Sequence, residues 1–255
     1  MDPKEVINLI QSGGVFDLTP EHFEGRLMST AEAEEIFKAF DAFWMYKGEA
    51  VAQKPHALLK SGKHSNGFIM CKAVLHYPRI CHLFANEVVK LIERSLAERI
   101  SEVDVIASSA YSAITLGWEV ARLLSLKHNP RMEYVIVEKD ENGNPTNIRG
   151  GIDQDKNVIV LNELMTTGSG STWETREAVI ECNTPEPSPK IFNQSFVLMH
   201  RSEDFFLADE SPVVPIFHFS IGNYDPEDCP WCKAGSKAIK PKLDNNWNIL
   251  HGITE

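Results

Sequence analysis

Hydrophobic positions in the middle of the chain follow two alternating patterns. Short runs of β-branched and other apolar residues predict buried strands. These candidates are Val103–Ala107, Glu133–Val137, Val158–Leu161, Ser195–Met199 and Val213–Phe219. Apolar residues three and four positions apart predict helices at Ile80–Ala97, Ile114–Ser125 and Trp173–Glu181. Because such alternation is typical of right-handed βαβ units, we predict an α/β fold with a central, mostly parallel five-stranded sheet flanked by helices.

The two ends of the chain have a different character. Thr30–Phe43 is an acidic helix candidate, and the segment after it contains Gly, Lys and His. The tail from Gly222 onward is rich in Asp, Pro, Cys, Trp and Lys. We therefore expect residues 1–75 and 222–255 to build a small cap over a core of residues 76–221.

Composition is that of an ordinary soluble globular protein. The 255 residues are 43% hydrophobic and 24% charged, and this length can bury a real core. A net charge of −11 argues against a nucleic-acid-binding surface but leaves room for a local cationic pocket. No apolar run approaches the ~20 residues of a membrane span, and the pattern of a signal peptide is missing. Since the five cysteines are scattered, we expect a cytoplasmic protein without a disulfide framework.

The segment from Val158 onward has the order expected of a phosphate site. The strand candidate runs into the polar pair Asn162–Glu163, then into the small-residue loop Thr166–Thr172, and then into a helix. Backbone N–H groups at a helix N-terminus point toward a bound anion, and the helix dipole favours its charge. The loop lacks the Lys of a P-loop, which disfavours nucleoside triphosphate hydrolysis. The alternative is an ordinary turn whose Ser and Thr side chains cap the helix.

Three further segments accompany this loop. They are LLKSGKHSNGFIMCKAVLHYP (Leu58–Pro78), VDVIASSAYSAITLGWEVARLL (Val103–Leu124) and EYVIVEKDENGNPTNIRGGI (Glu133–Ile152). In this order, the four segments resemble the type I phosphoribosyltransferases and, more narrowly, the orotate phosphoribosyltransferases, whose SGRHS signature is similar to SGKHS here. The tail DCPWCKAGSKAIKPK resembles a CPxCxxG…KP ending found in one branch of these enzymes. The resemblance covers roughly residues 55–242.

The resemblance implies transfer of ribose 5-phosphate from phosphoribosyl pyrophosphate (PRPP) to orotate, with release of pyrophosphate. The ribose carbon becomes oxocarbenium-like as pyrophosphate leaves, so cationic side chains and Mg²⁺ must neutralise the leaving group. The resemblance also implies that Mg²⁺ is bound mainly through the pyrophosphate of PRPP and that the chain forms a homodimer. Its expected partners are these small-molecule substrates, and neither nucleic acid nor a membrane.

Individual residues acquire roles from the same resemblance. PRPP binding is implied for Asn162, Glu163, Thr166, Thr167, Gly168, Ser169 and Gly170. The pyrophosphate-contacting loop would contain Ser109, Ala110, Tyr111 and Ser112. Binding of the base is implied for Lys60, Lys63 and His64. Catalytic roles are implied for Lys72, Lys139, Arg149 and Glu163.

Several positions depart from the family's pattern. Asn162 is an amide where the family has a carboxylate, and side chains in Ser108–Ala113 replace glycines that permit close backbone approach. If Asn162 limits activity, Asn162→Asp should raise turnover. A hypothesis of a different class is a PRPP- or nucleotide-binding regulatory protein whose catalysis is weak or lost. A third is transfer to a purine or another base, because the phosphate loop recognises only the shared sugar donor.

The loop Glu138–Gly151 is polar and carries cations at both ends, Lys139 and Arg149. With so little apolar content, it is expected not to anchor in its own core and to stay mobile until a polyanion draws it closed. In a homodimer, such a loop would reach the active site of the neighbouring chain.

Cys229-Pro-Trp-Cys232 has the CxxC spacing of a zinc half-site or a redox pair. A structural zinc site needs two more ligands, for which His218 and the distant Cys182 or His200 are the candidates. There is no second CxxC and no thioredoxin-like context. We therefore expect a compact turn with free thiols and no resident metal.

Overall fold

A mostly parallel sheet forms the centre of the molecule. The structure is a computed structural model that describes residues 1–141 and 145–253. Its strands are β5 (Val105–Ser109), β6 (Glu133–Lys139), β7 (Pro145–Asn147), β8 (Asn157–Met165), β9 (Lys190–Ile191), β10 (Ser195–His200) and β11 (Val213–His218). Their order is β11-β10-β8-β5-β6-β7, with β9 beside β8. Neighbouring strands are parallel except for β6 and β7. The predicted central sheet of five parallel strands (β5, β6, β8, β10 and β11) is confirmed.

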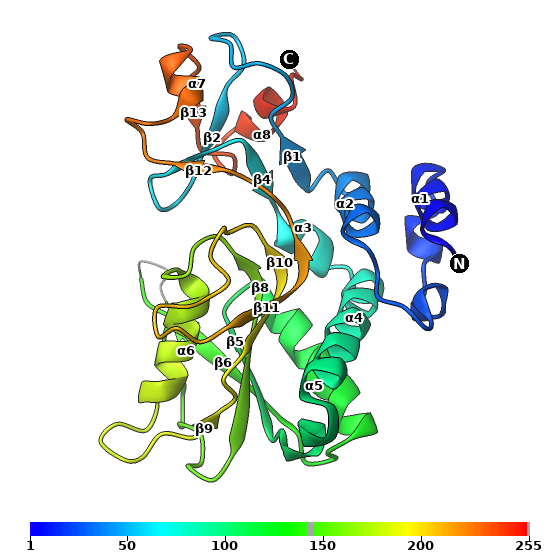
Figure 1. The fold of residues 1–255 in the computed structure, drawn as a ribbon, viewed down its shortest axis with the longest axis vertical. Coiled ribbons are helices and arrows are strands. Elements are labelled where there is room, and N and C mark those ends of the chain that lie inside the picture. Colours follow the sequence, from blue (N-terminus) through cyan, green and yellow to red (C-terminus); the bar gives the residue numbers. More distant parts are fainter. Residues whose placement is uncertain (142–144, 254–255) are drawn as a thin grey trace.

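Helices cover both faces of this sheet (Figure 1). α4 (Pro78–Leu96) and α5 (Ala113–Lys127) lie on one face, and α6 (Ser171–Glu181) lies on the other. In β8, Ile159 belongs to the apolar cluster beneath α4 and α5, whereas its neighbour Val160 belongs to the cluster beneath α6. This alternation follows from the pleat of a strand that is buried on both faces. The three predicted helices are confirmed, with ends that differ by a few residues.

Strand β8 extends further than its hydrophobic run predicts. Its pairing with β10 continues through Asn162 and Leu164 to Met165. Asn162 and Glu163 therefore lie inside the strand, and their side chains point to opposite faces of the sheet. The loop after the strand is correspondingly short, because α6 begins at Ser171.

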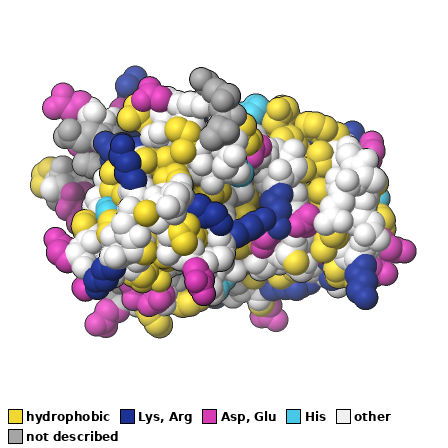
Figure 2. All heavy atoms as spheres, turned by 90° about the horizontal axis from the view of Figure 1, so that it is seen from above, with side chains coloured by type: hydrophobic (Ala, Val, Ile, Leu, Met, Phe, Trp, Pro, Cys, Tyr) yellow, Lys and Arg dark blue, Asp and Glu magenta, His cyan; other side chains and the backbone are white. Residues whose placement is uncertain are grey.

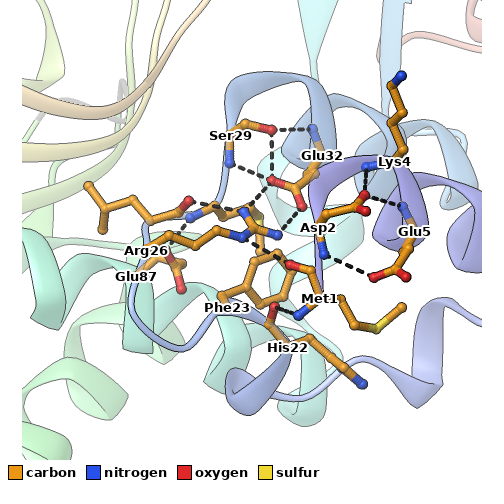
Figure 3. A network of polar contacts seen from close by, with 12 residues as sticks. Met1, Asp2, Lys4, Glu5, His22, Phe23, Arg26, Ser29, Glu32 and Glu87 are labelled. Atoms are coloured by element: carbon orange, nitrogen blue, oxygen red, sulfur yellow. Dashed lines mark hydrogen bonds and ion pairs between the residues drawn. The ribbon is translucent and has the colours of Figure 1, made fainter.

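The N-terminal segment packs against the core. It contains α1 (Pro3–Gln11), α2 (Thr30–Ala39) and two 3-10 helices, at Val15–Asp17 and Pro20–Phe23. A further 3-10 helix, at Ala97–Glu102, follows α4 in the core. The Arg26 guanidinium donates to both carboxylate oxygens of Glu32, at 2.8 and 2.6 Å, and the Met28 N–H donates to Glu87 of α4 at 2.6 Å (Figure 3). Both carboxylates are buried and depend on these donors. This network anchors the N-terminal segment to α4.

Both ends of the chain contribute to a small cap beyond the carboxyl ends of the central strands (Figure 1). Its elements are β1 (Phe43–Met45), β2 (His56–Leu58), β3 (His64–Ser65), β4 (Gly67–Ile69), β12 (Asn223–Tyr224), α7 (Pro230–Lys233), β13 (Ala238–Ile239) and α8 (Asn246–Leu250), and α3 (Cys71–Leu75) leads from it to the core. One sheet has the order β12-β3-β2-β13, and β1 pairs with β4. Among the described residues, no helix is both long and apolar enough to cross a membrane.

Candidate active site

Charged side chains face one another between the cap and the carboxyl ends of the central strands. Lys139, at the end of β6, interacts electrostatically with Glu163 of β8, Glu174 of α6, Lys60 of the β2–β3 loop and Lys242 of the C-terminal tail. Lys242 also acts on Glu163, and Lys60 on Glu174. Figure 2, in which the molecule is seen from above, shows several Lys and Arg side chains near the middle of that outer face. A chain of net negative charge thus presents a local cationic site.

Burial acts against the ionised forms of the two central groups. It lowers the pKa of Lys139 and raises the pKa of Glu163, while the attraction between their opposite charges acts the other way. Charges in such a setting interact more strongly than charges in water. Three lysines face Glu163 and Glu174, while Asp140 and Glu177 also act on Glu174. The three ammonium groups are the part of the site that suits a polyanion.

The loop Thr166–Gly170 joins β8 to α6 beside this cluster. No side-chain cap hydrogen bond closes the N-terminus of α6, as an ordinary capped turn would require. In the first turn, Thr172 is buried and its hydroxyl has no hydrogen-bond partner. A Cβ at Gly168 would lie 2.5 Å from the Phe206 carbonyl oxygen, so the loop depends on a close backbone approach there. Open N–H groups and an unpartnered hydroxyl at a helix N-terminus suit a phosphate.

Asn162 is fully engaged by the protein. Its Oδ1 accepts from the Ser109 N–H at 3.3 Å and the Ser109 hydroxyl at 2.9 Å. Its Nδ2 donates to the Ser171 carbonyl and to Thr175 Oγ1, both at 3.2 Å. The side chain is fully buried. The amide thus joins β5, β8 and the start of α6, and the two departures from the family's pattern, Asn162 and Ser109, are hydrogen-bonded partners.

These contacts add a stability effect to the Asn162→Asp prediction, whose expected rise in turnover stays a prediction. The carboxylate would keep its Ser109 donors but would place an anionic oxygen against the Ser171 carbonyl. We expect a loss of about 3 kcal/mol or more in the free energy of unfolding, because a buried donor is lost and a charge is buried. Urea denaturation measures this change, and Asn193→Asp, which adds the same charge at an exposed position, is the control. Unchanged stability in Asn162→Asp would contradict the assigned hydrogen bonds.

The expected pyrophosphate-contacting loop follows β5. Ser108 Oγ donates to the Ala113 carbonyl at 3.3 Å and accepts from the Tyr134 hydroxyl at 2.8 Å. The peptide bond between Ala110 and Tyr111 is cis. Because the Ser108 and Ser109 hydroxyls are both engaged inside the fold, they do not project from the loop toward the lysines.

Comparison with known proteins assigns this arrangement to a family. An orotate phosphoribosyltransferase from Thermoanaerobacter sp. (strain X514) is 30% identical over 212 residues, which cover 82% of this chain and 97% of the relative. The chain belongs to the orotate phosphoribosyltransferase family. An orotate phosphoribosyltransferase from Sulfurovum sp. (strain NBC37-1) is 28% identical over 77% of this chain and 96% of its own length. No family model matches the chain.

Among solved structures, orotate phosphoribosyltransferase from Aeropyrum pernix aligns with a TM-score of 0.48 at 14% identity, over 71% of this chain and 91% of that chain. The members of this family are phosphoribosyltransferases, a class of glycosyltransferases.

The structure brings together some of the residues that the family resemblance singled out. Lys60, Lys139 and Glu163 meet in the site, as described above. Lys63 instead pairs with Asp225 at 3.3 Å, and Lys72 is exposed on α3. His64 lies in the cap, with its Nδ1 3.2 Å from the Cys232 sulfur. Lys63 and His64 therefore contact groups of the cap, and their expected contact with a base stays a prediction.

The loop Glu138–Gly151 is better anchored than its polar composition predicts. β7 pairs with Glu138 and Lys139 of β6, and both Ile148 of the loop and Ile152, directly after it, are buried in the cluster beneath α6. The expectation that this loop cannot anchor in its own core is wrong for the described part, and residues 142–144 lie outside it. One buried isoleucine inside the loop and one directly after it anchor the segment to the core, although its average composition is polar. Arg149 pairs with Glu138 at 2.9 Å and remains 85% exposed.

Sequence reasoning missed two cations. Lys242 lies in the KP ending that carried part of the resemblance, and this was its only signal. Arg201, just after β10, donates to the Gly67 carbonyl at 2.9 Å, Ser65 Oγ at 2.6 Å and Asn223 Oδ1 at 2.8 Å. It is buried, it has no carboxylate partner in the part of the chain that the structure describes, and its Nε has no partner at all.

Burial lowers the pKa of Arg201 to about 10. Buried charges are normally paired with an opposite charge. An uncompensated guanidinium at the seam between core and cap is therefore suited to an anionic ligand. Nothing in the sequence around Arg201 distinguishes it from any other Arg at a strand end.

Proposed function

We propose that the chain transfers ribose 5-phosphate from PRPP to orotate and releases pyrophosphate. The observation that carries this proposal is the cluster of Lys60, Lys139 and Lys242 around Glu163, beside the uncapped N-terminus of α6. One ligand with phosphate groups at two ends fits both features at once. The membership of the orotate phosphoribosyltransferase family supports the same substrate.

Each group of residues in the site has its own proposed role. Thr166–Gly170 and the first turn of α6 hold the 5′-phosphate, and the Glu163 carboxylate accepts hydrogen bonds from the ribose hydroxyls. The lysines neutralise charge that develops on the leaving pyrophosphate. The orotate carboxylate meets Arg201, whose buried charge has no other anionic partner among the described residues. No protein nucleophile is needed, because positioning and electrostatic stabilisation lower the barrier.

We propose that Mg²⁺ binds together with PRPP. The carboxylates that face the lysines, Glu163 and Glu174, are oxygen ligands of the kind that Mg²⁺ prefers alongside substrate phosphates. The bound ion would supply additional neutralisation of the pyrophosphate. The cap covers the site and excludes water that would otherwise hydrolyse the sugar donor.

Glu163→Gln is expected to stabilise the protein at neutral pH while weakening PRPP binding. Because burial raises the pKa of Glu163 above 4.5, the ionised form costs folding free energy above the raised pKa. That cost vanishes below 4.5, where the group is protonated in both states. Gln mimics the protonated form, so its stability gain should fade as the pH drops. A charge-assisted hydrogen bond is worth about 1.5–3 kcal/mol, so PRPP affinity should fall roughly ten- to hundredfold.

Denaturation at several pH values and calorimetry with PRPP and Mg²⁺ measure the two effects of Glu163→Gln. Glu181→Gln, at the exposed end of α6, should change neither. A Glu163→Gln protein that binds PRPP as tightly as wild type would remove this carboxylate from the ribose site.

We also propose that the chain acts as a homodimer. A concave apolar surface of about 400 Å³ beside α5 and β6 includes Ile114, Trp118 and Ile136. Trp118 is 54% exposed and Ile136 is 37% exposed. Exposed apolar surface of this kind marks an interaction site. It lies next to β6, which ends at Lys139, so a second copy seated there would stand beside the active site.

Trp118→Glu is expected to convert the dimer into a monomer, because a carboxylate would be buried in the apolar interface. Sedimentation equilibrium should give twice the 28.7 kDa chain mass for wild type and the chain mass for the variant. Leu126→Glu, on an exposed position near the other end of α5, should remain dimeric. A monomeric wild type would rule the dimer out, and a dimeric Trp118→Glu would place the interface elsewhere.

The choice of acceptor is tested by offering orotate, uracil, hypoxanthine and xanthine in turn with PRPP and Mg²⁺, and identifying the nucleotide by chromatography. We expect orotidine 5′-phosphate alone. A nucleotide formed from a purine and not from orotate would replace the proposed substrate.

The second candidate function is a binding or regulatory protein without catalysis. The hydrogen-bonded pair Asn162 and Ser109 favours it, because it occupies positions where the family has a carboxylate and a glycine-rich loop. Such a binding protein would bind PRPP as the enzyme does, so only an assay of turnover distinguishes the two functions.

A further inference from the structure

Four metal-ligating side chains meet in the cap, apart from the proposed active site. They are His56 of β2, His64 of β3, Cys229 just before α7 and Cys232 within α7. Their ligand atoms all lie within 4.8 Å of one another. His56, His64 and Cys229 are buried, and Cys232 is half-buried. The cluster therefore joins the N-terminal strands of the cap to the C-terminal tail.

The distances match the edges of one coordination tetrahedron. Zinc–sulfur bonds of about 2.3 Å and zinc–nitrogen bonds of about 2.05 Å imply tetrahedral edges of about 3.3 Å between two nitrogens and about 3.6 Å between nitrogen and sulfur. His56 Nε2 lies 3.1 Å from His64 Nδ1. The Cys229 sulfur is 3.4 Å from His56 Nε2, and the Cys232 sulfur is 3.7 Å from His56 Nε2 and 3.2 Å from His64 Nδ1.

A neighbouring hydroxyl orients His56 as a ligand. Ser236 Oγ donates to the Lys54 carbonyl at 2.6 Å, so it accepts from His56 Nδ1–H at 2.8 Å. The Nε2 lone pair then points at the two sulfurs. A neutral imidazole whose other nitrogen is held by a hydrogen bond is the usual form of a metal-bound histidine.

The two cysteines lie on a tight turn. The Lys233 N–H donates to the Cys229 carbonyl at 3.1 Å, and the Gly235 N–H donates to the Cys232 carbonyl at 2.9 Å. Gly235 has φ +82°, a backbone conformation that glycine adopts without strain. Trp231, between the cysteines, packs near the ring of His56. The turn aims both sulfurs at the histidines, and an aromatic side chain closes one side of the cluster.

We propose that His56, His64, Cys229 and Cys232 bind one zinc ion as a structural site that fastens the two ends of the chain together in the cap. Two thiolates and two imidazoles in a tetrahedral arrangement are the donor set that selects Zn²⁺. Four protein ligands leave no open position for a substrate, so the role is structural. The site does not depend on the proposed transferase activity.

The cap needs a stabilising link between the two chain segments that form it. Its strands are only two or three residues long. Its own apolar cluster has Trp44, Ala57 and Leu250 as its buried members. A core this small rarely holds a fold together without a metal or a disulfide. The ion would also fix the β2–β3 hairpin between its two histidines, and that hairpin carries Lys60 into the active site.

The test starts with the full-length wild-type chain, purified without chelator and analysed by plasma mass spectrometry. We expect one zinc per chain. The double variant Cys229→Ser/Cys232→Ser should retain almost none, and Cys182→Ser, which removes a half-buried thiol outside the cluster, should retain all of it. Exchange of Co²⁺ into wild type needs no variant to fold, and should give tetrahedral d–d bands with thiolate-to-cobalt charge-transfer absorption.

Three results would each overturn the zinc site. The first is a wild-type chain that binds neither Zn²⁺ nor Co²⁺ with all five thiols reduced. The second is undiminished zinc in the double variant. The third is a loss of two thiols to a disulfide between Cys229 and Cys232 in the protein as isolated, which would make the motif a redox pair.

Discussion

Replacing Lys139 with alanine is expected to lower kcat/KM for PRPP by about 10²–10³-fold. A preorganised charged or hydrogen-bonding group aimed at developing negative charge contributes this much in a site that excludes water. Lys139 is the residue on which the other charges converge, since Lys60, Lys242, Glu163 and Glu174 all act on it. Its pKa is lowered chiefly by burial, so we expect the proposed pyrophosphate ligand to add counter-charge here.

Steady-state kinetics with PRPP varied at saturating orotate measure the Lys139→Ala effect. Lys190→Ala is the matched control, because Lys190 is exposed and pairs in register with Asn157 at the opposite end of β8. The control should keep wild-type kinetics. An active Lys139→Ala chain, within a few-fold of wild type, would mean that the pyrophosphate lies elsewhere.

Arg201→Met is expected to raise the KM for orotate by about 100-fold while leaving the KM for PRPP within a few-fold of wild type. The charge-assisted hydrogen bonds of a guanidinium to a carboxylate supply about 3 kcal/mol, and methionine removes them while keeping much of the volume. The acceptors that Arg201 leaves are not all orphaned, because Ser65 Oγ also bonds Gly222 and Gly67. The effect should therefore appear in binding of the base.

Arg201→Lys separates charge from geometry, because a lysine keeps the charge and loses the planar fork. Its KM for orotate should fall between those of wild type and Arg201→Met. Circular dichroism and urea denaturation confirm that each variant is folded. Equal rises in both KM values would indicate a general disturbance of the cap and would remove Arg201 from the base site.

The central sheet was predictable because its signal is local. Each of its five long strands contains a short apolar run, and the helices between them repeat at three- and four-residue spacing. The end of β8 was not predictable in this way, since Asn162 and Glu163 interrupt the apolar run while the strand continues. Partners in α6 and β5 stabilise Asn162 there, and a hydropathy pattern contains no record of them.

The charged site was predictable only in part. Lys139 and Glu163 follow from motifs on β6 and β8, which lie on either side of β5. The two residues meet because the carboxyl ends of parallel strands share one edge of the sheet. Lys242 comes from the C-terminal tail, and Arg201 carries no motif. The four residues of the proposed zinc site were still harder to predict from the sequence, because Cys229 and His56 are 173 positions apart. The pairings of β13 with β2 and of β12 with β3 bring those segments together, so a search near the CxxC for His218, Cys182 or His200 could not find them.

The proposed transferase function requires turnover. The measurement that tests it most directly is pyrophosphate release after wild-type chain is mixed with PRPP, Mg²⁺ and orotate, with binding of PRPP followed calorimetrically on the same sample. We predict binding of PRPP and continuous pyrophosphate release that requires orotate and is lost in Lys139→Ala. Tight binding of PRPP with no release of pyrophosphate from any base would contradict the transferase and leave a binding protein on the same fold.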